Sequence, residues 1–308
     1  MESPYSIRLP LIGTALARDR MRLRFLPATM PMPTLFPSAL RLPFSVRALA
    51  PAAALACVLA LAGCASGPQD NLSLVPAQLD QQTRQDGLFT QPVKWTREQP
   101  GCSGECPTLT VDSLAFPGHP RLTTLIDHAL AAMTWVDTQT TAPYDTLAGF
   151  EAWYWKTAGS RDQIQLTART RYRNERLTVV ELDAGQYRTG MAHGMSGSQL
   201  LNWDNAAEKA LTIDNLLVPG ARPAFDAALR TVHGQWLDQH AESFDDRETF
   251  DRMWPFAPSD NVGLTDLGLL VKYQPYEIAP YAWGQPELLI PYDQLRGILR
   301  PQYLPPQS

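Results

Sequence analysis

Residues 163–182, which read QIQLTARTRYRNERLTVVEL, give the clearest structural signal in the sequence. From Gln163 to Arg173, polar side chains alternate with apolar or small ones, the period expected of a strand with one buried face. A turn at Asn174 and Glu175 separates this run from a second apolar run at 177–182. The stretch therefore predicts a β-hairpin. We expect the arginines on its polar side to face solvent.

Upstream of this hairpin, the sequence predicts one strand and two helices. The alternating stretch 108–112 is typical of a strand. Apolar residues then recur three and four positions apart, the spacing of an amphipathic helix: Leu122, Leu125, Ile126, Ala129, Leu130 and Met133. A second helical segment after Pro143 carries Leu147, Phe150, Trp153 and Tyr154. We interpret both apolar stripes as core packing.

Downstream of the hairpin, residues 198–203 predict a third strand. Asp214 is in a position to cap a short helical turn that runs through Leu217. Pro223 opens a helix near its first turn, the position that proline tolerates best. Apolar residues on one face of that helix predict that it packs on the core.

Toward the C-terminus, the sequence predicts paired strands at 262–264 and 267–273, a further strand at 288–290 and a short terminal helix at 293–299. Strands cluster along the chain instead of alternating with helices. This order predicts an α+β fold, with a largely antiparallel sheet and helices packed on one side.

The composition limits the function classes. The chain has 308 residues, of which 44% are apolar, so it can bury a sizeable core. Its 26 basic and 31 acidic residues give a net charge of −5, which argues against a protein that coats nucleic acid. The sequence has only one long apolar run, which excludes a membrane protein with several spans.

That single apolar run, at 48–62, is typical of a secretory signal. Arg41 and Arg47 precede it, and 61–64 read Leu-Ala-Gly-Cys. This ending resembles the lipobox of bacterial lipoproteins, in which the cysteine is lipidated and becomes the first residue; the lipidated residue here is Cys64. Ala65 follows, with no aspartate after the cysteine, and by the same resemblance this implies the outer membrane, periplasmic face. The alternative is an uncleaved anchor with a chance cysteine.

The expected organisation has four parts. Residues 1–63 are a signal peptide with an N-terminal extension, and Val46 is a possible true start. Residues 64–100 are a lipidated tether, 101–189 an N-terminal α+β segment, and 190–308 a C-terminal domain. Removing residues 1–63 takes away seven arginines and two acids, so the mature chain carries 19 basic and 29 acidic residues, a charge of −10. Such a charge favours cationic partners at low salt, and it also simply keeps a protein soluble.

Two cysteines remain in the exported chain, in the sequence 101–107, Gly-Cys-Ser-Gly-Glu-Cys-Pro. In an oxidising compartment Cys102 and Cys106 predict a disulfide that closes a small loop. A lone pair lacks the four ligands of a structural zinc site. The spacing is also not that of a Cys-x-x-Cys redox motif. We expect no metal and no cofactor.

Two segments contain residue types that carry binding or chemistry. His193 lies between glycines in 190–194 and could be a general base or a ligand, or form only structural hydrogen bonds. The stretch 273–284 reads YQPYEIAPYAWG. Its aromatic residues and Glu277 could contact a sugar or a protein. Packing against the sheet is the alternative for the tyrosines, and capping a turn for Glu277.

Several pieces of the C-terminal half together resemble the RsiV-type domain, found in an anti-sigma factor that senses lysozyme and in some peptidoglycan deacetylases. They are 190–194 (GMAHG), 201–204 (LNWD), 211–217 (LTIDNLL), 268–273 (GLLVKY), 276–282 (YEIAPYA) and 290–292 (IPY). The resemblance implies an extracytoplasmic α+β binding module. It marks as candidate ligand-binding residues His193, Tyr276, Glu277, Tyr281, Trp283 and Tyr292.

Three functional hypotheses follow. The first is a non-enzymatic lipoprotein, attached to the membrane only by its lipid, that binds lysozyme or a related cell-wall enzyme. The second is a peptidoglycan-binding module that uses the aromatic loop. The third is an enzyme that acts on cell-wall glycan through His193 or Glu277.

Overall fold

The computed structural model describes residues 89–137, 139–243 and 245–305. The predicted signal peptide, Cys64 and the tether up to residue 88 lie outside these residues. Among the helices in the described part of the chain, none has both the length and the apolar character to cross a membrane.

The first layer is a six-stranded sheet whose strands lie side by side in chain order. Its strands are β1 (Gln91–Glu98), β2 (Thr108–Ala115), β3 (Gln163–Arg173), β4 (Leu177–Tyr187), β5 (Met195–Asp204) and β6 (Lys209–Leu211). All neighbours are antiparallel except β2 and β3, which are parallel. The predicted hairpin at 163–182 is confirmed as β3 and β4. The α+β class with a largely antiparallel sheet is confirmed as well.

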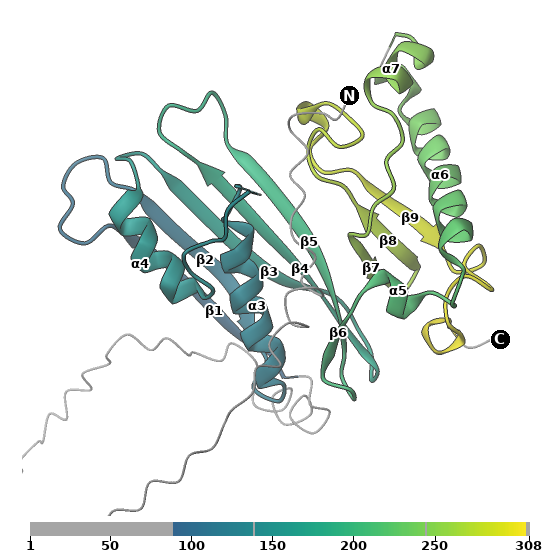
Figure 1. Ribbon diagram of the computed structural model, residues 1–308, viewed down its shortest axis with the longest axis horizontal. Helices are drawn as coiled ribbons and strands as arrows, with labels where there is room; N and C mark the ends of the chain where they lie inside the picture. Colours follow the sequence, from purple (N-terminus) through teal and green to yellow (C-terminus); the bar gives the residue numbers. More distant parts are fainter. Residues whose placement is uncertain (1–88, 138, 244, 306–308) are drawn as a thin grey trace, which may run out of the picture. The chain divides into compact units, whose positions relative to one another are not determined.

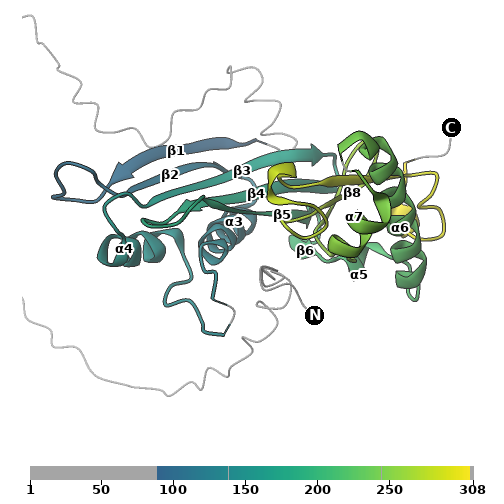
Figure 2. The same ribbon diagram turned by 90° about the horizontal axis from the view of Figure 1, so that it is seen from above.

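Two helices cover one face of this sheet, α3 (Pro120–Met133) and α4 (Leu147–Thr157), and Figure 2 shows them on the same side of the strands. They lie in the connection between β2 and β3, because a parallel step needs a crossover. The apolar stripe predicted for α3 is buried throughout. Together with Leu166 of β3 and Leu182 of β4 it forms the first hydrophobic core.

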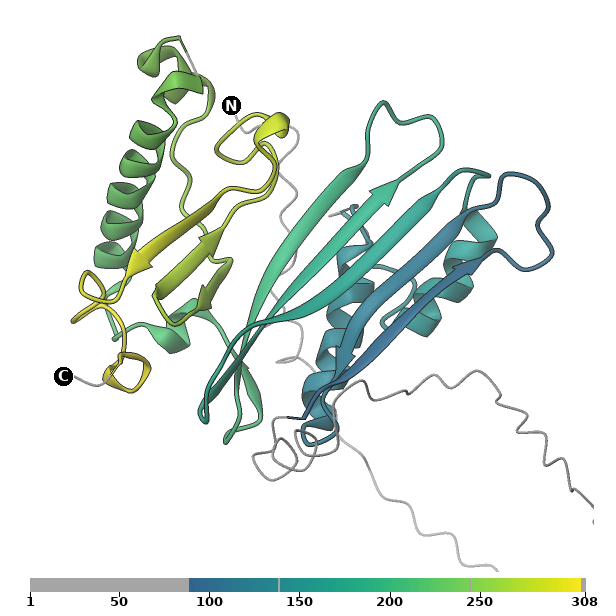
Figure 3. The ribbon, with the colours of Figure 1, turned by 180° about the vertical axis from the view of Figure 1, so that it is seen from behind.

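The second layer is a three-stranded antiparallel sheet with its own helix. Its strands are β7 (Val262–Leu264), β8 (Gly268–Lys272) and β9 (Glu287–Pro291), in the order β7–β8–β9. The helices of this half are α5 (Ile213–Leu216), α6 (Arg222–Gln239) and α7 (Arg247–Met253). Figures 1 and 3 show α6 running along the three strands. A second hydrophobic core joins α5, α6 and this sheet to Leu177 and Val179 of β4.

Some predicted boundaries are wrong. Residues 91–98, placed in the tether, form the edge strand β1. The cap of α5 is Thr212 instead of Asp214, because the Thr212 hydroxyl and the Asn215 side chain form a reciprocal capping box. The expected helix at 293–299 is a series of turns. Gly297 adopts a φ of 78°, which a continuing helix does not allow.

The remaining boundary of the expected organisation, between 189 and 190, falls in the connection between β4 and β5. These two strands pair from Leu177 opposite Asp204 to Gln186 opposite Met195. The first sheet therefore continues across this position. In the β1–β2 connection, Cys102 and Cys106 form a disulfide, with an Sγ–Sγ distance of 2.01 Å.

Candidate binding site

Three of the predicted site residues, His193, Tyr276 and Tyr281, lie together with Trp254 in a group of aromatic rings, which we call the aromatic cluster. The ring centroid of His193 is 4.4 Å from that of Tyr281, and Tyr276 is 5.4 Å from Tyr281. Trp254 stacks on Tyr276 at 6.2 Å and an interplanar angle of 25°. His193 is exposed and the other three rings are partly exposed. The cluster therefore offers aromatic surface to a partner.

The backbone of the loop 273–284 explains how Tyr276 reaches this position. Tyr276 has a φ of 68°, in the left-handed region that a bulky side chain rarely adopts. Next to it, the Glu277 carboxylate accepts a hydrogen bond from the Gln274 backbone N–H (2.8 Å). Burial raises the pKa of Glu277, against the opposite effect of that hydrogen bond. Glu277 thus caps a turn, and the strained Tyr276 is held within it.

Both ends of this loop are fastened, one to β5 and the other to the residue just before it. Gln274 forms two hydrogen bonds with the backbone of Ser198: its Nε2 donates to the carbonyl (2.6 Å), and its Oε1 accepts from the N–H (2.9 Å). At the other end, the Tyr281 hydroxyl donates to the carbonyl of Gly194 (2.9 Å). His193 Nδ1 lies 2.8 Å from the same carbonyl oxygen. These contacts fix the rings of the loop relative to His193.

Asparagine side chains join the two sheets further along β5. Asn261 donates to the Ser198 carbonyl (3.0 Å) and accepts from the Leu200 N–H (2.7 Å). In return, Asn202 of β5 donates to the Val262 carbonyl (2.7 Å) and accepts from the Leu264 N–H (3.0 Å). Side-chain amides thus satisfy backbone groups that a neighbouring strand would satisfy in a continuous sheet.

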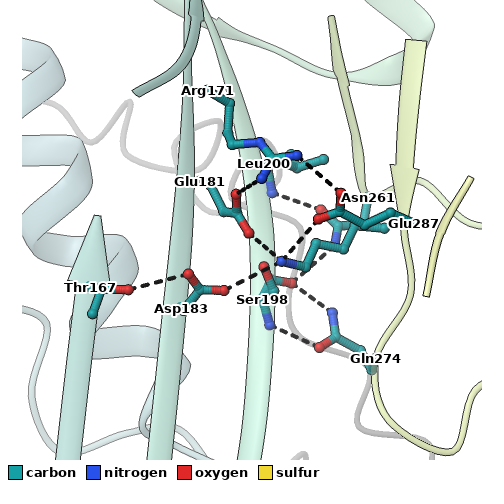
Figure 4. A network of polar contacts seen from close by, with 10 residues as sticks. Thr167, Arg171, Glu181, Asp183, Ser198, Leu200, Asn261, Gln274 and Glu287 are labelled. Atoms are coloured by element: carbon teal, nitrogen blue, oxygen red, sulfur yellow. Dashed lines mark hydrogen bonds and ion pairs between the residues drawn. The ribbon is translucent and has the colours of Figure 1, made fainter. Parts of the chain in front are cut away.

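A buried ion network completes the junction, shown in Figure 4. Lys272 of β8 forms an ion pair with Glu181 of β4, and both side chains are less than a tenth exposed. Lys272 Nζ also lies 3.7 Å from Asp183 and 3.4 Å from Glu287. Arg171 contacts both Glu181 and Glu287 at 3.0 Å. It is exposed, as expected, and it also takes part in the network.

The other two predicted ligand residues lie elsewhere. Trp283 packs at 5.3–5.4 Å against Trp236, His240 and Phe250, in a small core between α6 and α7. The Tyr292 hydroxyl donates to the Thr265 carbonyl (2.6 Å) in the turn between β7 and β8. Burial raises the pKa of Tyr292 to about 12. Neither residue belongs to the aromatic cluster.

An acidic segment beside the cluster was not predicted from the sequence. Residues 238–252 carry six acids and two arginines, and all six acidic side chains are exposed: Asp238, Glu242, Asp245, Asp246, Glu248 and Asp251. Arg247 pairs with Asp238 (2.9 Å) and Asp251 (3.0 Å), while Asp246 caps α7. The segment leads directly into Met253, 61% exposed, and Trp254. The density of acids was the signal that could have found it.

Metal binding has no support in the geometry. Within the residues that the structure describes, no three side chains from His, Cys, Asp or Glu gather as a metal ion would require. The site combines the rings of the aromatic cluster with the exposed carboxylates of the acidic segment.

This fold and site define an α+β protein with a rigid aromatic loop held against a sheet edge. Residues 214–293 match the family model DUF3298, described as a protein of unknown function. The chain is similar to a crystallised DUF3298 family protein from Pseudomonas aeruginosa PAO1, at 34% identity and a TM-score of 0.65. That match covers 71% of this chain and 97% of the other. The chain belongs to the DUF3298 family.

A second crystallised DUF3298 family member, from Bacteroides fragilis, has the same fold at 19% identity and a TM-score of 0.52. That match covers 69% of this chain and 92% of the Bacteroides fragilis protein. Among curated proteins the chain has no match.

Proposed function

We propose that this protein is a lipid-anchored binding protein of the cell envelope, and that its DUF3298 region binds a cationic cell-wall enzyme such as lysozyme without catalysing a reaction itself. In this proposal Cys64 carries the lipid, in the outer membrane and facing the periplasm. The apolar run at 48–62 and the Leu-Ala-Gly-Cys ending support the anchor. The resemblance to the RsiV-type domain supports the class of partner.

One observation carries the proposal: a fixed group of accessible aromatic rings adjoins an exposed acidic segment. Binding energy at protein interfaces concentrates in aromatic anchors, surrounded by contacts that exclude water. Because Gln274 and Tyr281 already fasten the loop to β5, little conformational freedom is left to lose on binding. Exposed Met253, next to Trp254 of the cluster, extends this apolar surface.

Charge selects the kind of partner. Two arginines against six acids give the acidic segment a net charge of −4, and the mature chain as a whole carries −10. A negative patch beside an apolar contact speeds association with a positively charged protein and disfavours acidic ones. The engagement of the Glu277 carboxylate within its own turn favours binding over catalysis by that residue.

The test is calorimetric titration of the purified protein with a c-type lysozyme at low and moderate salt. We expect saturable binding that weakens as salt rises, because exposed charges are screened. Tyr281→Ala and Trp254→Ala should each weaken binding about tenfold or more, as expected for interface anchors. Tyr281→Phe keeps the ring and removes its bond to Gly194, so it separates ring contact from loop anchoring.

Matched controls give the charge argument its own test. Glu242→Gln with Glu248→Gln should slow association and flatten the salt dependence, because both acids lie in the acidic segment. Glu98→Gln removes the same kind of charge from the edge strand β1 and should change neither. Absence of heat at both salt concentrations would remove lysozyme as the partner. If both sets of charge changes have equal effects, the acidic segment is not the part of the protein that attracts the partner.

The anchor needs a separate measurement. Labelling of growing cells with a fatty acid should mark the wild-type protein, and Cys64→Ser should abolish the label and release the protein from membranes. Retention of the label by the variant would contradict lipidation at Cys64.

A further inference from the structure

A cavity of about 360 Å³ lies at the far end of the first sheet from the aromatic cluster. Four separate parts of the chain line it: the β3–β4 hairpin, the β7–β8 turn, the residues after β9, and the C-terminal segment at 302–305. Convergence of distant segments at the junction of two packed layers is a common setting for ligand sites. The C-terminal segment is fixed there, because Arg300 donates from its backbone N–H to Leu216 (2.9 Å) and from Nε to Leu217 (2.9 Å).

Tyrosine rings form the inner wall of the cavity. Tyr172 and Tyr292 are partly exposed and Tyr303 is buried. Asn174 donates to the Tyr172 hydroxyl (3.0 Å), which leaves that hydroxyl's own hydrogen available. Tyr292 instead donates to Thr265 (2.6 Å), which leaves its oxygen lone pairs available. The two hydroxyls thus offer a ligand one donor and one acceptor.

Charged side chains surround the opening. Glu175, Arg176 and Asp266 are exposed cavity residues. In the described part of the chain, these three side chains form no ion pair and no hydrogen bond with another protein group. Their carboxylate and guanidinium groups are therefore available to a ligand. Each of these planar groups can form hydrogen bonds with two hydroxyls at once.

We propose that this cavity binds a neutral saccharide of one or two rings. A sugar ring has an apolar face that stacks on tyrosine and a rim of hydroxyls that both donate and accept hydrogen bonds. The cavity matches both features, with rings inside and planar polar groups at its mouth. Two carboxylates beside one guanidinium disfavour an anion, and the volume lies at the lower end of the range for small-molecule pockets.

The saccharide site is independent of the proposed partner surface. His193 precedes the first residue of β5, whereas Leu177 of the cavity pairs with its last residue, Asp204. A ten-residue strand spans about 30 Å, at about 3.3 Å per residue. Substitutions at one end therefore leave the other end untouched.

The experiment titrates the purified protein with two probes, N,N′-diacetylchitobiose and cellobiose, followed by saturation-transfer NMR and calorimetry. At least one probe should bind in the millimolar range or tighter. Asp266→Asn and Tyr172→Ala should each weaken that binding about tenfold, as loss of one charge-assisted hydrogen bond or one stacking contact implies. Asp266→Asn should not alter the melting temperature by more than a few degrees, because Asp266 is exposed.

Tyr281→Ala is the matched control, since it removes a partly exposed tyrosine at the opposite end of β5. It should leave saccharide binding unchanged. The proposal is overturned if neither probe binds at about 10 mM, or if Tyr281→Ala weakens binding while Tyr172→Ala does not. Lysozyme binding is scored on the same variants, so failure of one proposal is visible separately from failure of the other.

Discussion

The two faces of β4 are buried in different ways. On one face, Val180 and Leu182 pack among the apolar side chains of α3 and the sheet. On the other face, Glu181 and Asp183 meet Lys272 of the second sheet. Glu181 is buried like Val180 and Leu182, yet only the second face depends on charge.

This difference shows that a contact can contribute in two ways: by stabilising the packed layers, or by fixing their relative position. Apolar burial is favourable in many arrangements, because it is non-directional and scales with area. Hydrogen bonds and buried ion pairs are favourable only within narrow limits of distance and angle. We infer that the apolar cores hold the layers together, and that Lys272, Asn261 and Gln274 set where the second sheet sits on β5.

The largest expected effect is on the apolar face. Leu182→Ala removes a side chain that is fully buried in the first core. The lost burial and the remaining cavity should lower the free energy of unfolding by about 4 kcal/mol. Urea unfolding measures this. The neighbouring exposed position Thr170 gives the control, since Thr170→Ala should cost less than about 0.5 kcal/mol.

The next effect is on the charged face. Lys272→Met should cost about 3 kcal/mol, because it leaves the buried carboxylate of Glu181 with only Arg171 as its ionic partner. The double change Glu181→Leu and Lys272→Met should return to within about 1 kcal/mol of the wild type, since apolar side chains replace both charges. If the double variant is as unstable as Lys272→Met alone, the ion network contributes to the free energy of unfolding as well as to the placement of the second sheet.

A smaller effect is expected at the amide contacts. Gln274→Ala removes both hydrogen bonds to the Ser198 backbone, at a cost of about 1–2 kcal/mol. Amide hydrogen exchange should become faster at Ser198. The Leu200 amide, which Asn261 holds, is an internal reference and should change much less. Equal acceleration at both amides would mean that the two sheets separate as a unit instead of being fastened residue by residue.

The sequence predicts the parts of this molecule that depend on local pattern. The β3–β4 hairpin and α3 follow from alternation and helical spacing. The alternation of burial along β3 breaks at Thr167, which is buried, and the strand has a register shift between Thr170 and Tyr172; no periodic rule anticipates either. Strand β1 was missed because its side chains are mostly polar and it lies at the sheet edge, where one neighbour suffices.

The site was less predictable, because its contacts join residues far apart in the chain. His193 and Tyr281 were both singled out as loop residues, but their contact depends on how β5 meets the second sheet. Lys272 and Glu181 are separated by 91 residues, and neither sequence neighbourhood indicates the other. Trp254 joins the cluster through the end of α7, a helix that the sequence analysis did not predict.

The smallest expected effect is on the pH dependence of stability, and it concerns a buried histidine of α6. His233 of α6 is buried between Trp236 and Phe256, and its Nε2 has no hydrogen-bond partner in the described part of the protein. Burial lowers its pKa; Arg247 and Arg230 lower it further, while Asp251 opposes them. The unfolded chain therefore binds a proton more readily than the folded chain. Stability should fall as the pH drops below about 6.5, the ordinary histidine value.

His233→Phe should remove that part of the pH dependence, because phenylalanine fills a similar space without a titrating group. The melting temperatures of the wild type and the variant are measured from pH 7.5 to pH 5. We expect the melting temperature of the variant to fall less on acidification, so that the two curves converge or cross. Thr170→Ala is the control, since it changes an exposed side chain without removing a titrating group and should leave the slope unchanged. Parallel curves for the wild type and His233→Phe would show that His233 does not contribute to the acid sensitivity of this fold.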